Sequence, residues 1–208
     1  MHYTRYEVAY AEATQLVAQM LQTAVIIGMT VYQTVVTVKS IATLASQSKL
    51  ISASEYASQA TYANQIENSL KGTSLKNRTV TTAELRNKQL AEIGYTDPPC
   101  KPGTPAIGFK TAQSSGNVYI KLGSSEDIQP GAFVTKLSDI QGLTPEQIKS
   151  KLALPYTPTH YKYVNIPENQ QMYASITNNI YGGAGEFVQY DLGITPPYSW
   201  YSAAHPLN

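Results

Sequence analysis

The sequence predicts an α+β protein in which a helical N-terminal segment precedes a compact, mainly antiparallel β domain. Residues 1–70 contain no proline and a single glycine, and the near absence of these two helix breakers favours helices. From residue 116 onward, short runs rich in tyrosine, isoleucine and valine alternate with glycine and proline, which is typical of strands joined by turns. We therefore expect three regions: helical residues 1–70, a linker over residues 71–115 and a C-terminal domain over residues 116–208.

Within the N-terminal region we expect two packed helices, at residues 3–44 with a break and at residues 52–69. A run of 26 uncharged residues at positions 13–38 has the length of a membrane span. However, glutamine and threonine interrupt the run, and its densest apolar part, residues 24–32, is too short to cross a bilayer. A segment that contacts a membrane transiently during delivery is the alternative interpretation, and a stable transmembrane helix is the third.

The linker region combines a polar stretch, a short helix and a proline-rich arm. Residues 71–82 are rich in Gly, Ser and Thr and indicate a linker. A helix is expected over residues 83–93, with Thr82 as its N-cap and Gly94 as the residue that ends it. Residues 97–108 contain four prolines and two glycines, so we expect a hinge or an extended arm there.

The C-terminal domain is expected to contain five short strands and one helix. At residues 144–147 a threonine N-cap, a proline at the first helical position and a glutamine that completes a capping box predict a helix over residues 145–153. Eight of the 16 tyrosines lie within residues 156–201, a density that suits a half-buried sheet with a cleft for stacking. The expected strands are residues 117–122, 132–135, 161–166, 171–176 and 187–192.

Charge and cysteine content disfavour several functional classes. Charged residues make up 14% of the chain, and the formal net charge is +1. Residues 111–208 hold five basic against seven acidic side chains, which argues against the basic face that a nuclease needs for phosphates. Cys100 is the single cysteine, so an internal disulfide is excluded. Its turn-rich surroundings lack the helix N-terminus that would activate a thiol, and we expect a structural role.

Several common catalytic motifs are absent from the sequence. It contains no phosphate-binding loop ending in Gly-Lys-Ser/Thr, no dinucleotide fingerprint and no Gly-x-Ser-x-Gly elbow. His2, His160 and His205 lie far apart and show no zinc-ligand spacing, so no metal site is expected. Taken singly, His160 and Gln189 have ordinary structural interpretations, and the glycine cluster at residues 181–186 suits a tight turn as well as a ligand-binding loop.

Five short motifs in a fixed order carry the one specific indication of function. The motifs are Tyr119-Ile-Lys-Leu-Gly-Ser124, Gly131-Ala-Phe-Val-Thr135, Lys151-Leu-Ala-Leu-Pro155, His160-Tyr-Lys-Tyr-Val164 and Gly182-Gly-Ala-Gly-Glu-Phe-Val-Gln-Tyr190. Over residues 117–192 their order resembles the tuberculosis necrotizing toxin domain family, and it is similar to the C-terminal toxin domains of contact-dependent growth inhibition effectors. The resemblance covers a little over a third of the chain.

The resemblance implies a scaffold like that of ADP-ribosyltransferases and the hydrolysis of NAD to nicotinamide and ADP-ribose, or the transfer of ADP-ribose to a macromolecule. NAD is then the substrate, with no cofactor and no metal. Two of the family's arginines are lysines here, and lysine lacks the bidentate grip of arginine on phosphate. The implied catalytic residues are Gln189, His160 and Glu186. The implied NAD-binding residues are Lys121, Tyr119, Lys151, Gly183 and Tyr190, of which Lys121 and Lys151 replace the arginines.

The same resemblance implies secretion as part of a larger cell-surface effector, with residues 1–70 as the delivery segment and with action in the cytoplasm of a target cell. A cognate immunity protein in the producing cell is the expected partner. Two alternatives stay open. One is a metal-independent RNase directed at tRNA, which would use His160, Lys162 or His205 with tyrosines and bind nucleic acid. The other is a membrane-active or binding module whose working part is residues 13–38.

Overall fold

The structure belongs to the α+β class that the sequence predicts, with one mainly antiparallel sheet and few helices. The chain divides into two compact units, residues 1–67 and residues 68–208, and the second unit contains the sheet. The computed structural model describes residues 53–71, 75–111 and 116–207.

The described part of the first unit belongs to helix α3 (Ala53–Leu70), which agrees with the second of the two expected N-terminal helices. The first expected helix, at residues 3–44, and the uncharged run at residues 13–38 lie outside the described residues. Among the helices that the structure does describe, none combines the length and the apolar character needed to cross a bilayer.

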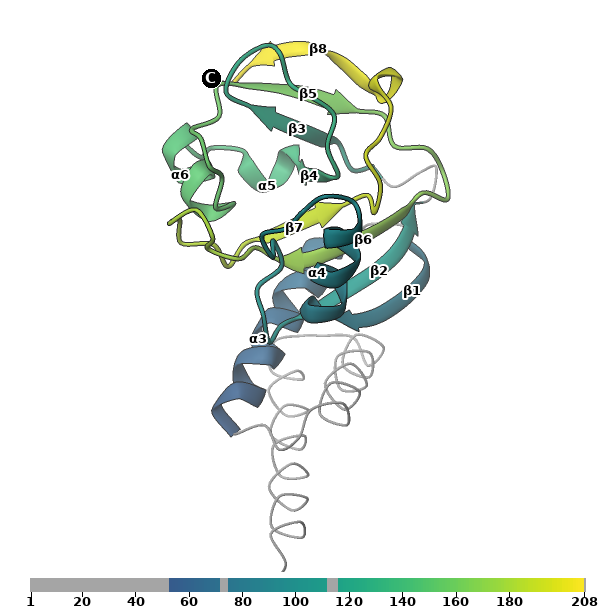
Figure 1. The fold of residues 1–208 in the computed structure, drawn as a ribbon, viewed down its shortest axis with the longest axis vertical. Coiled ribbons are helices and arrows are strands. Elements are labelled where there is room, and N and C mark those ends of the chain that lie inside the picture. The colour runs from purple at the N-terminus through teal and green to yellow at the C-terminus, as the bar shows by residue number, and fades with distance from the viewer. Residues whose placement is uncertain (1–52, 72–74, 112–115, 208) are drawn as a thin grey trace, which may run out of the picture. The chain divides into compact units, whose positions relative to one another are not determined.

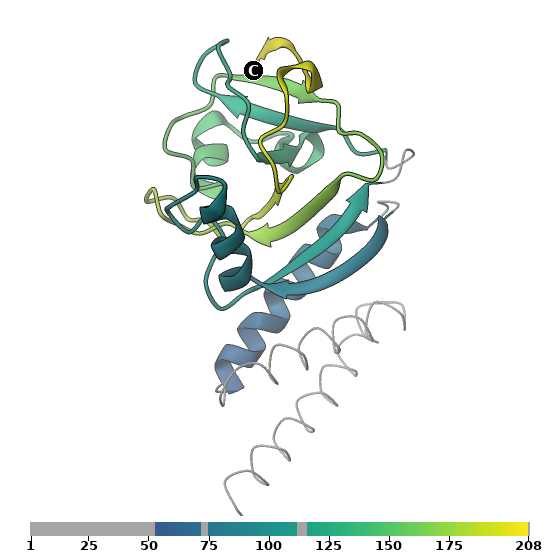
Figure 2. The ribbon, with the colours of Figure 1, turned by 45° about the vertical axis from the view of Figure 1, so that its right-hand side comes forward.

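The described strands of the second unit are β1 (Leu75–Thr82), β2 (Pro105–Thr111), β3 (Tyr119–Gly123), β4 (Phe133–Lys136), β5 (His160–Val164), β6 (Gln171–Ile176), β7 (Val188–Asp191) and β8 (Tyr201–Pro206). They form one sheet in the order β1-β2-β6-β7-β4-β3-β5-β8, and every neighbouring pair is antiparallel. Figures 1 and 2 show β3, β5 and β8 as one layer and β1, β2, β6 and β7 as another. The short strand β4 joins the two layers, so the sheet bends there.

Strand β1 lies where the sequence indicates a linker, and that secondary-structure prediction is wrong. The strand pairs with β2 along its length, apart from an irregularity between Lys76 and Thr79. As an edge strand it has a partner on one side only, which suits its charged and polar side chains, and threonine favours extended backbone. The expected proline-rich arm likewise runs into β2, where Pro105 is the first residue and need not donate to the ladder.

The other elements predicted for residues 83–192 are confirmed with small shifts of their ends. Helix α4 (Ala83–Glu92) begins after Thr82, whose Oγ1 accepts a hydrogen bond of 3.2 Å from Leu85 N. Helix α6 (Pro145–Lys151) has the predicted capping box, because Thr144 and Gln147 exchange side-chain-to-backbone hydrogen bonds. The five expected strands correspond to β3–β7, whereas β8, α5 (Leu137–Ile140) and the 3-10 turn η1 (Tyr198–Trp200) have no counterpart in the prediction.

Two sets of contacts hold the helices to the sheet. Arg86 of α4 and Asp191 of β7 form a buried ion pair, in which Arg86 Nε donates to Asp191 Oδ2 at 3.2 Å. On the other side, an apolar cluster packs α5 and α6 against β3, and this burial is the main stabilising contribution there. Its buried members are Ile120, Leu122, Ile140, Ile148 and Leu152. These contacts fix the positions at which the loops that follow α4 and α6 begin.

Candidate active site

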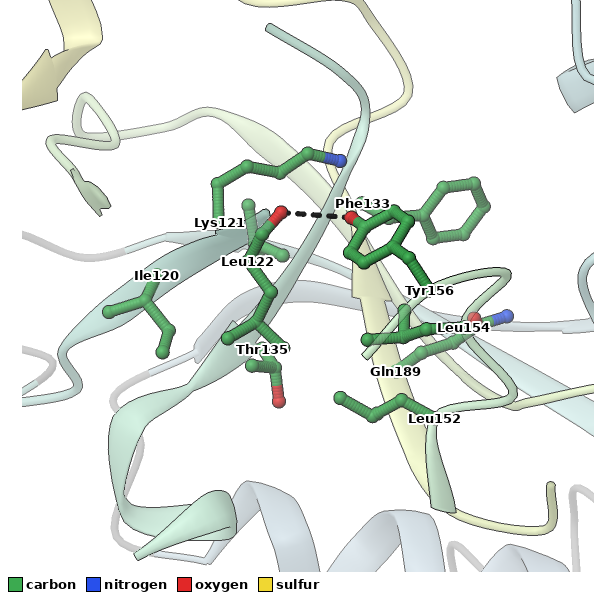
Figure 3. A pocket seen from close by; sticks show the side chains of 10 residues that line it. Ile120, Lys121, Leu122, Phe133, Thr135, Leu152, Leu154, Tyr156 and Gln189 are labelled. Carbon is green, nitrogen blue, oxygen red and sulfur yellow. Dashed lines mark hydrogen bonds between the residues drawn. The ribbon is translucent and has the colours of Figure 1, made fainter. Parts of the chain in front are cut away.

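A cleft with a volume of about 380 Å³ opens where three loops meet the middle of the sheet. The loops follow α4, α6 and β6, and they form its walls. The sheet contributes Lys121 of β3, Phe133 of β4 and Gln189 of β7. A smaller chamber of about 60 Å³ shares these three residues with the cleft (Figure 3). The cleft thus brings together segments that are far apart in the sequence.

Gln189 is held in place by its amide nitrogen. Nε2 donates to the Pro99 carbonyl at 2.9 Å and to Ser175 Oγ at 3.3 Å. Because a carbonyl oxygen only accepts hydrogen bonds, the contact with Pro99 fixes which end of the amide is the nitrogen. Oε1 has no hydrogen-bond partner among the described residues. The largely buried side chain therefore presents an oriented, unused acceptor at the edge of the cleft.

Lys121 is a cation without a counter-charge. Within the described part of the chain, no residue forms an ion pair or a hydrogen bond with its Nζ. Burial lowers the pKa of Lys121 to about 8, because loss of water penalises the charged form. Its tip lies over Gly131, where an added Cβ atom would be 3.0 Å from Nζ. In the view of Figure 3 the Lys121 amine lies near the top of the lining side chains and the Gln189 amide at their right, with Tyr156 between them.

Two tyrosines that sequence reasoning did not single out, Tyr95 and Tyr156, also line the cleft. The hydroxyl of Tyr95 accepts a hydrogen bond from Ala132 N at 2.9 Å, and the hydroxyl of Tyr156 donates to Leu122 O at 3.0 Å (Figure 3). Both hydroxyls are thus bonded to backbone, and the rings form parts of the walls. The density of tyrosines in the sequence indicates a stacking cleft, but it does not indicate which tyrosines reach it.

His160 and Glu186 are not among the residues that line the cleft. His160 Nδ1 lies 2.9 Å from Thr159 Oγ1, and His160 Nε2 lies 3.9 Å from Glu126 Oε1. Glu186 adopts a left-handed backbone conformation with a φ of 62° and forms an ion pair with Lys101. Of the three expected catalytic residues, only the glutamine is part of the cleft.

Four of the five expected NAD-binding residues belong to the packing around the cleft rather than to its lining. Tyr119 and Tyr190 are buried against each other, with ring centroids 5.4 Å apart, and burial raises the pKa of both hydroxyls. Lys151 Nζ lies 5.3 Å from the centre of the Phe187 ring. Of this set, Lys121 alone lines the cleft.

The fourth of these residues, Gly183, lies in the glycine loop (residues 177–187) between β6 and β7. A Cβ atom on Gly183 would lie 2.5 Å from Ser150 O, and Gly185 N donates to the same carbonyl at 3.1 Å. Glycine is required here because the loop backbone approaches α6 closely. The same loop carries Tyr181 to the wall of the cleft. The glycine cluster therefore shapes the wall.

Cys100 fits the structural role that the sequence predicts. The residue is fully buried, and its Sγ lies 3.3 Å from Ser175 Oγ. Burial raises the pKa of the thiol to about 12. A nucleophilic cysteine reacts as the thiolate, so this thiol is poorly suited to nucleophilic catalysis at neutral pH.

The residues of the RNase alternative lie on two faces of the sheet. In β5, His160 and Lys162 alternate with Tyr161, and β8 places His205 opposite Tyr161. Because successive residues of a strand face opposite sides, His205 shares a face with Tyr161. The two rings stack there with centroids 5.4 Å apart. Lys162 Nζ donates to Ile128 O at 3.2 Å. The sheet thus separates His205 from the other two basic residues.

In the described part of the chain, no group of three or more His, Cys, Asp or Glu side chains is arranged to hold a metal ion. Comparisons with protein-family models, with curated proteins and with solved structures found no match to this chain. A functional proposal therefore depends on the order of the sequence motifs and on the geometry of the cleft.

Proposed function

We propose that this protein is a toxin domain that hydrolyses NAD to nicotinamide and ADP-ribose in the cytoplasm of a target cell. The observation that carries the proposal is that Lys121 and Gln189, which belong to the first and the last of the five motifs, line one cleft. The antiparallel sheet bends at β4 (Figure 1), and Phe133 of that strand lines the cleft; this arrangement supports a scaffold like that of ADP-ribosyltransferases.

Cleavage of the bond between nicotinamide and ribose depends mainly on positioning and electrostatics. The nicotinamide ring is positively charged in NAD and departs as a neutral molecule, while positive charge develops on the ribose. A fixed acceptor dipole near that carbon stabilises the transition state, and a positioned water completes the hydrolysis. Gln189 Oε1 would supply this acceptor, either to a ribose hydroxyl or to the attacking water.

The other lining groups suit the remainder of the dinucleotide. The Lys121 ammonium attracts the negative pyrophosphate. In the view of Figure 3 Tyr156 lies between this amine and the Gln189 amide, so the ammonium would be kept apart from the positive charge that develops on the ribose. Tyr156 and Tyr181 offer aromatic rings for stacking on the bases.

Replacement of Gln189 tests the proposal. Gln189→Met keeps the length of the side chain and removes the acceptor, so we expect kcat/KM for NAD hydrolysis to fall about 100-fold or more. The matched control is Ser175→Ala, which removes one partner of Nε2 and leaves the Pro99 contact in place. Its activity should stay within about fivefold of the wild-type value, because a neutral hydrogen bond contributes about 1 kcal/mol.

Two results would count against this proposal. Full activity of Gln189→Met, with an unchanged melting temperature, would show that Gln189 has no part in catalysis. If the NAD concentration stays constant in the presence of the folded wild-type chain, the protein does not hydrolyse NAD.

A further inference from the structure

We infer that Lys121 is a carbonyl-reactive amine: in the cleft it condenses with the aldehyde of a small ligand and forms an imine. The inference goes beyond NAD hydrolysis, because it concerns a covalent step at Nζ and needs no nicotinamide-bearing ligand. Three features support it. The amine opens to a cavity, it has no partner among the described residues, and a glycine gives it room.

The titratable groups around the Lys121 amine are engaged elsewhere or form no bond with it. The tyrosines Tyr95, Tyr156 and Tyr201 each hydrogen-bond a backbone atom. So does Lys162, the neighbour of Lys121 on the adjacent strand. The carboxylate of Asp97 lines the cleft and makes no ion pair with Lys121. The Lys121 amine is therefore left for a ligand.

Gly131 gives the amine its room. A Cβ atom at this position would lie 3.0 Å from Nζ and 3.5 Å from Cε of Lys121, so a larger residue would displace the tip of the side chain. The cleft beside the amine has a volume of about 380 Å³ and aromatic walls that include Phe133 and Tyr156. These dimensions and walls suit a small aldehyde carried on an uncharged aromatic ring.

The neutral form of the amine is the one that reacts. With a pKa of about 8, roughly half of the Lys121 side chains are neutral at pH 8, against about 0.4% for a lysine of ordinary pKa. The Nζ lone pair adds to the carbonyl carbon. The carbonyl oxygen then leaves as water with the two amine protons, and a carbon–nitrogen double bond joins ligand and lysine. No oxidant or reductant is consumed.

The test uses pyridoxal, an aromatic aldehyde without a phosphate, so that electrostatic attraction to surface lysines does not select the site. The full chain is incubated with pyridoxal at about pH 8 and treated with borohydride, whose hydride converts the imine into a stable amine. Peptide mass spectrometry then locates the label. We expect the occupancy at Lys121 to exceed that at every other lysine by about tenfold or more.

Two variants control the labelling. Lys121→Arg keeps a positive charge and cannot form an imine, so the label at this position should disappear. Lys162→Arg changes the cross-strand neighbour, and labelling of Lys121 should remain at the wild-type level. Labelling of Lys121 no higher than that of the exposed Lys88 would overturn the inference. Because the readout does not involve NAD, failure of either proposal leaves the other testable.

Discussion

Arg86→Met removes the positive charge from the buried ion pair between α4 and β7 and leaves the Asp191 carboxylate without its counter-charge. The two side chains are 4% and 0% exposed. Arg86 Nε donates to Asp191 Oδ2 at 3.2 Å, and its guanidinium carbon lies 3.9 Å from the centre of the Tyr173 ring. Methionine retains much of this packing, so the substitution mainly removes the charge.

The free energy of unfolding should fall by about 3–5 kcal/mol at neutral pH, the usual cost of removing one partner from a buried ion pair. For a unit of residues 68–208, the melting temperature should fall by roughly 10–15 °C. Burial raises the pKa of Asp191 and Arg86 opposes this effect, so the pKa of Asp191 rises further in the variant. The decrease in the free energy of unfolding should become smaller as the pH falls, because Asp191 in the folded variant then takes up a proton and is no longer an unpaired charge.

Thermal and urea unfolding, followed by circular dichroism from about pH 4 to about pH 8, measures this difference. Lys76→Met is the matched control. It removes an ion pair with Glu168 whose side chains are 52% and 36% exposed, and it should cost less than about 1 kcal/mol. The reasoning would be refuted if Arg86→Met lowered the free energy of unfolding by less than about 1 kcal/mol, or if the decrease did not change with pH.

Three further experiments probe the elements around the cleft. Gly183→Ala should lower the free energy of unfolding by about 1–3 kcal/mol, because the new Cβ would lie 2.5 Å from Ser150 O; an unchanged melting temperature would contradict that contact. Thr144→Ala should cost about 1 kcal/mol through loss of the α6 cap, which Thr144→Ser should largely preserve. Cys100, with its pKa raised by burial to about 12, should react with iodoacetamide about 100-fold more slowly in the folded chain than in urea. Equal rates would show an accessible thiol.

The elements predicted best are those whose signals lie within their own few residues. Helix α6 has its cap, its first-turn proline and its capping box within residues 144–147. Helix α4 has Thr82 at its start and Gly94 just beyond its end. Strand β6 occupies the predicted residues without a shift. In each case the local backbone preference and the tertiary structure agree.

The two edge strands could not be predicted, because their extended conformation depends on distant partners. The polar sequence of β1 reads as a linker until β2 pairs with it. Strand β8 lies in the proline- and tyrosine-rich tail and is ordered against β5. Pairing of this kind depends on the arrangement of the whole sheet, and the sequence of a single segment does not contain it.

For the candidate site, the order of the motifs groups Lys121 with Gln189, and both residues line one cleft in the structure. It does not reveal that a strand register and an ion pair hold His160 and Glu186 in other positions. The tyrosines that line the cleft could not be predicted for a different reason. Tyr156 becomes part of the cleft because α6 packs against β3, a tertiary contact that residue type alone does not indicate.

A time course of NAD, free nicotinamide and ADP-ribose with the purified full chain tests the central claim most directly, with total RNA incubated in a parallel tube. We expect nicotinamide and ADP-ribose to appear in equal amounts as NAD disappears, while the RNA stays intact. Unchanged NAD in the presence of the folded chain, together with degraded RNA in the parallel tube, would contradict NAD hydrolysis and favour the RNase alternative.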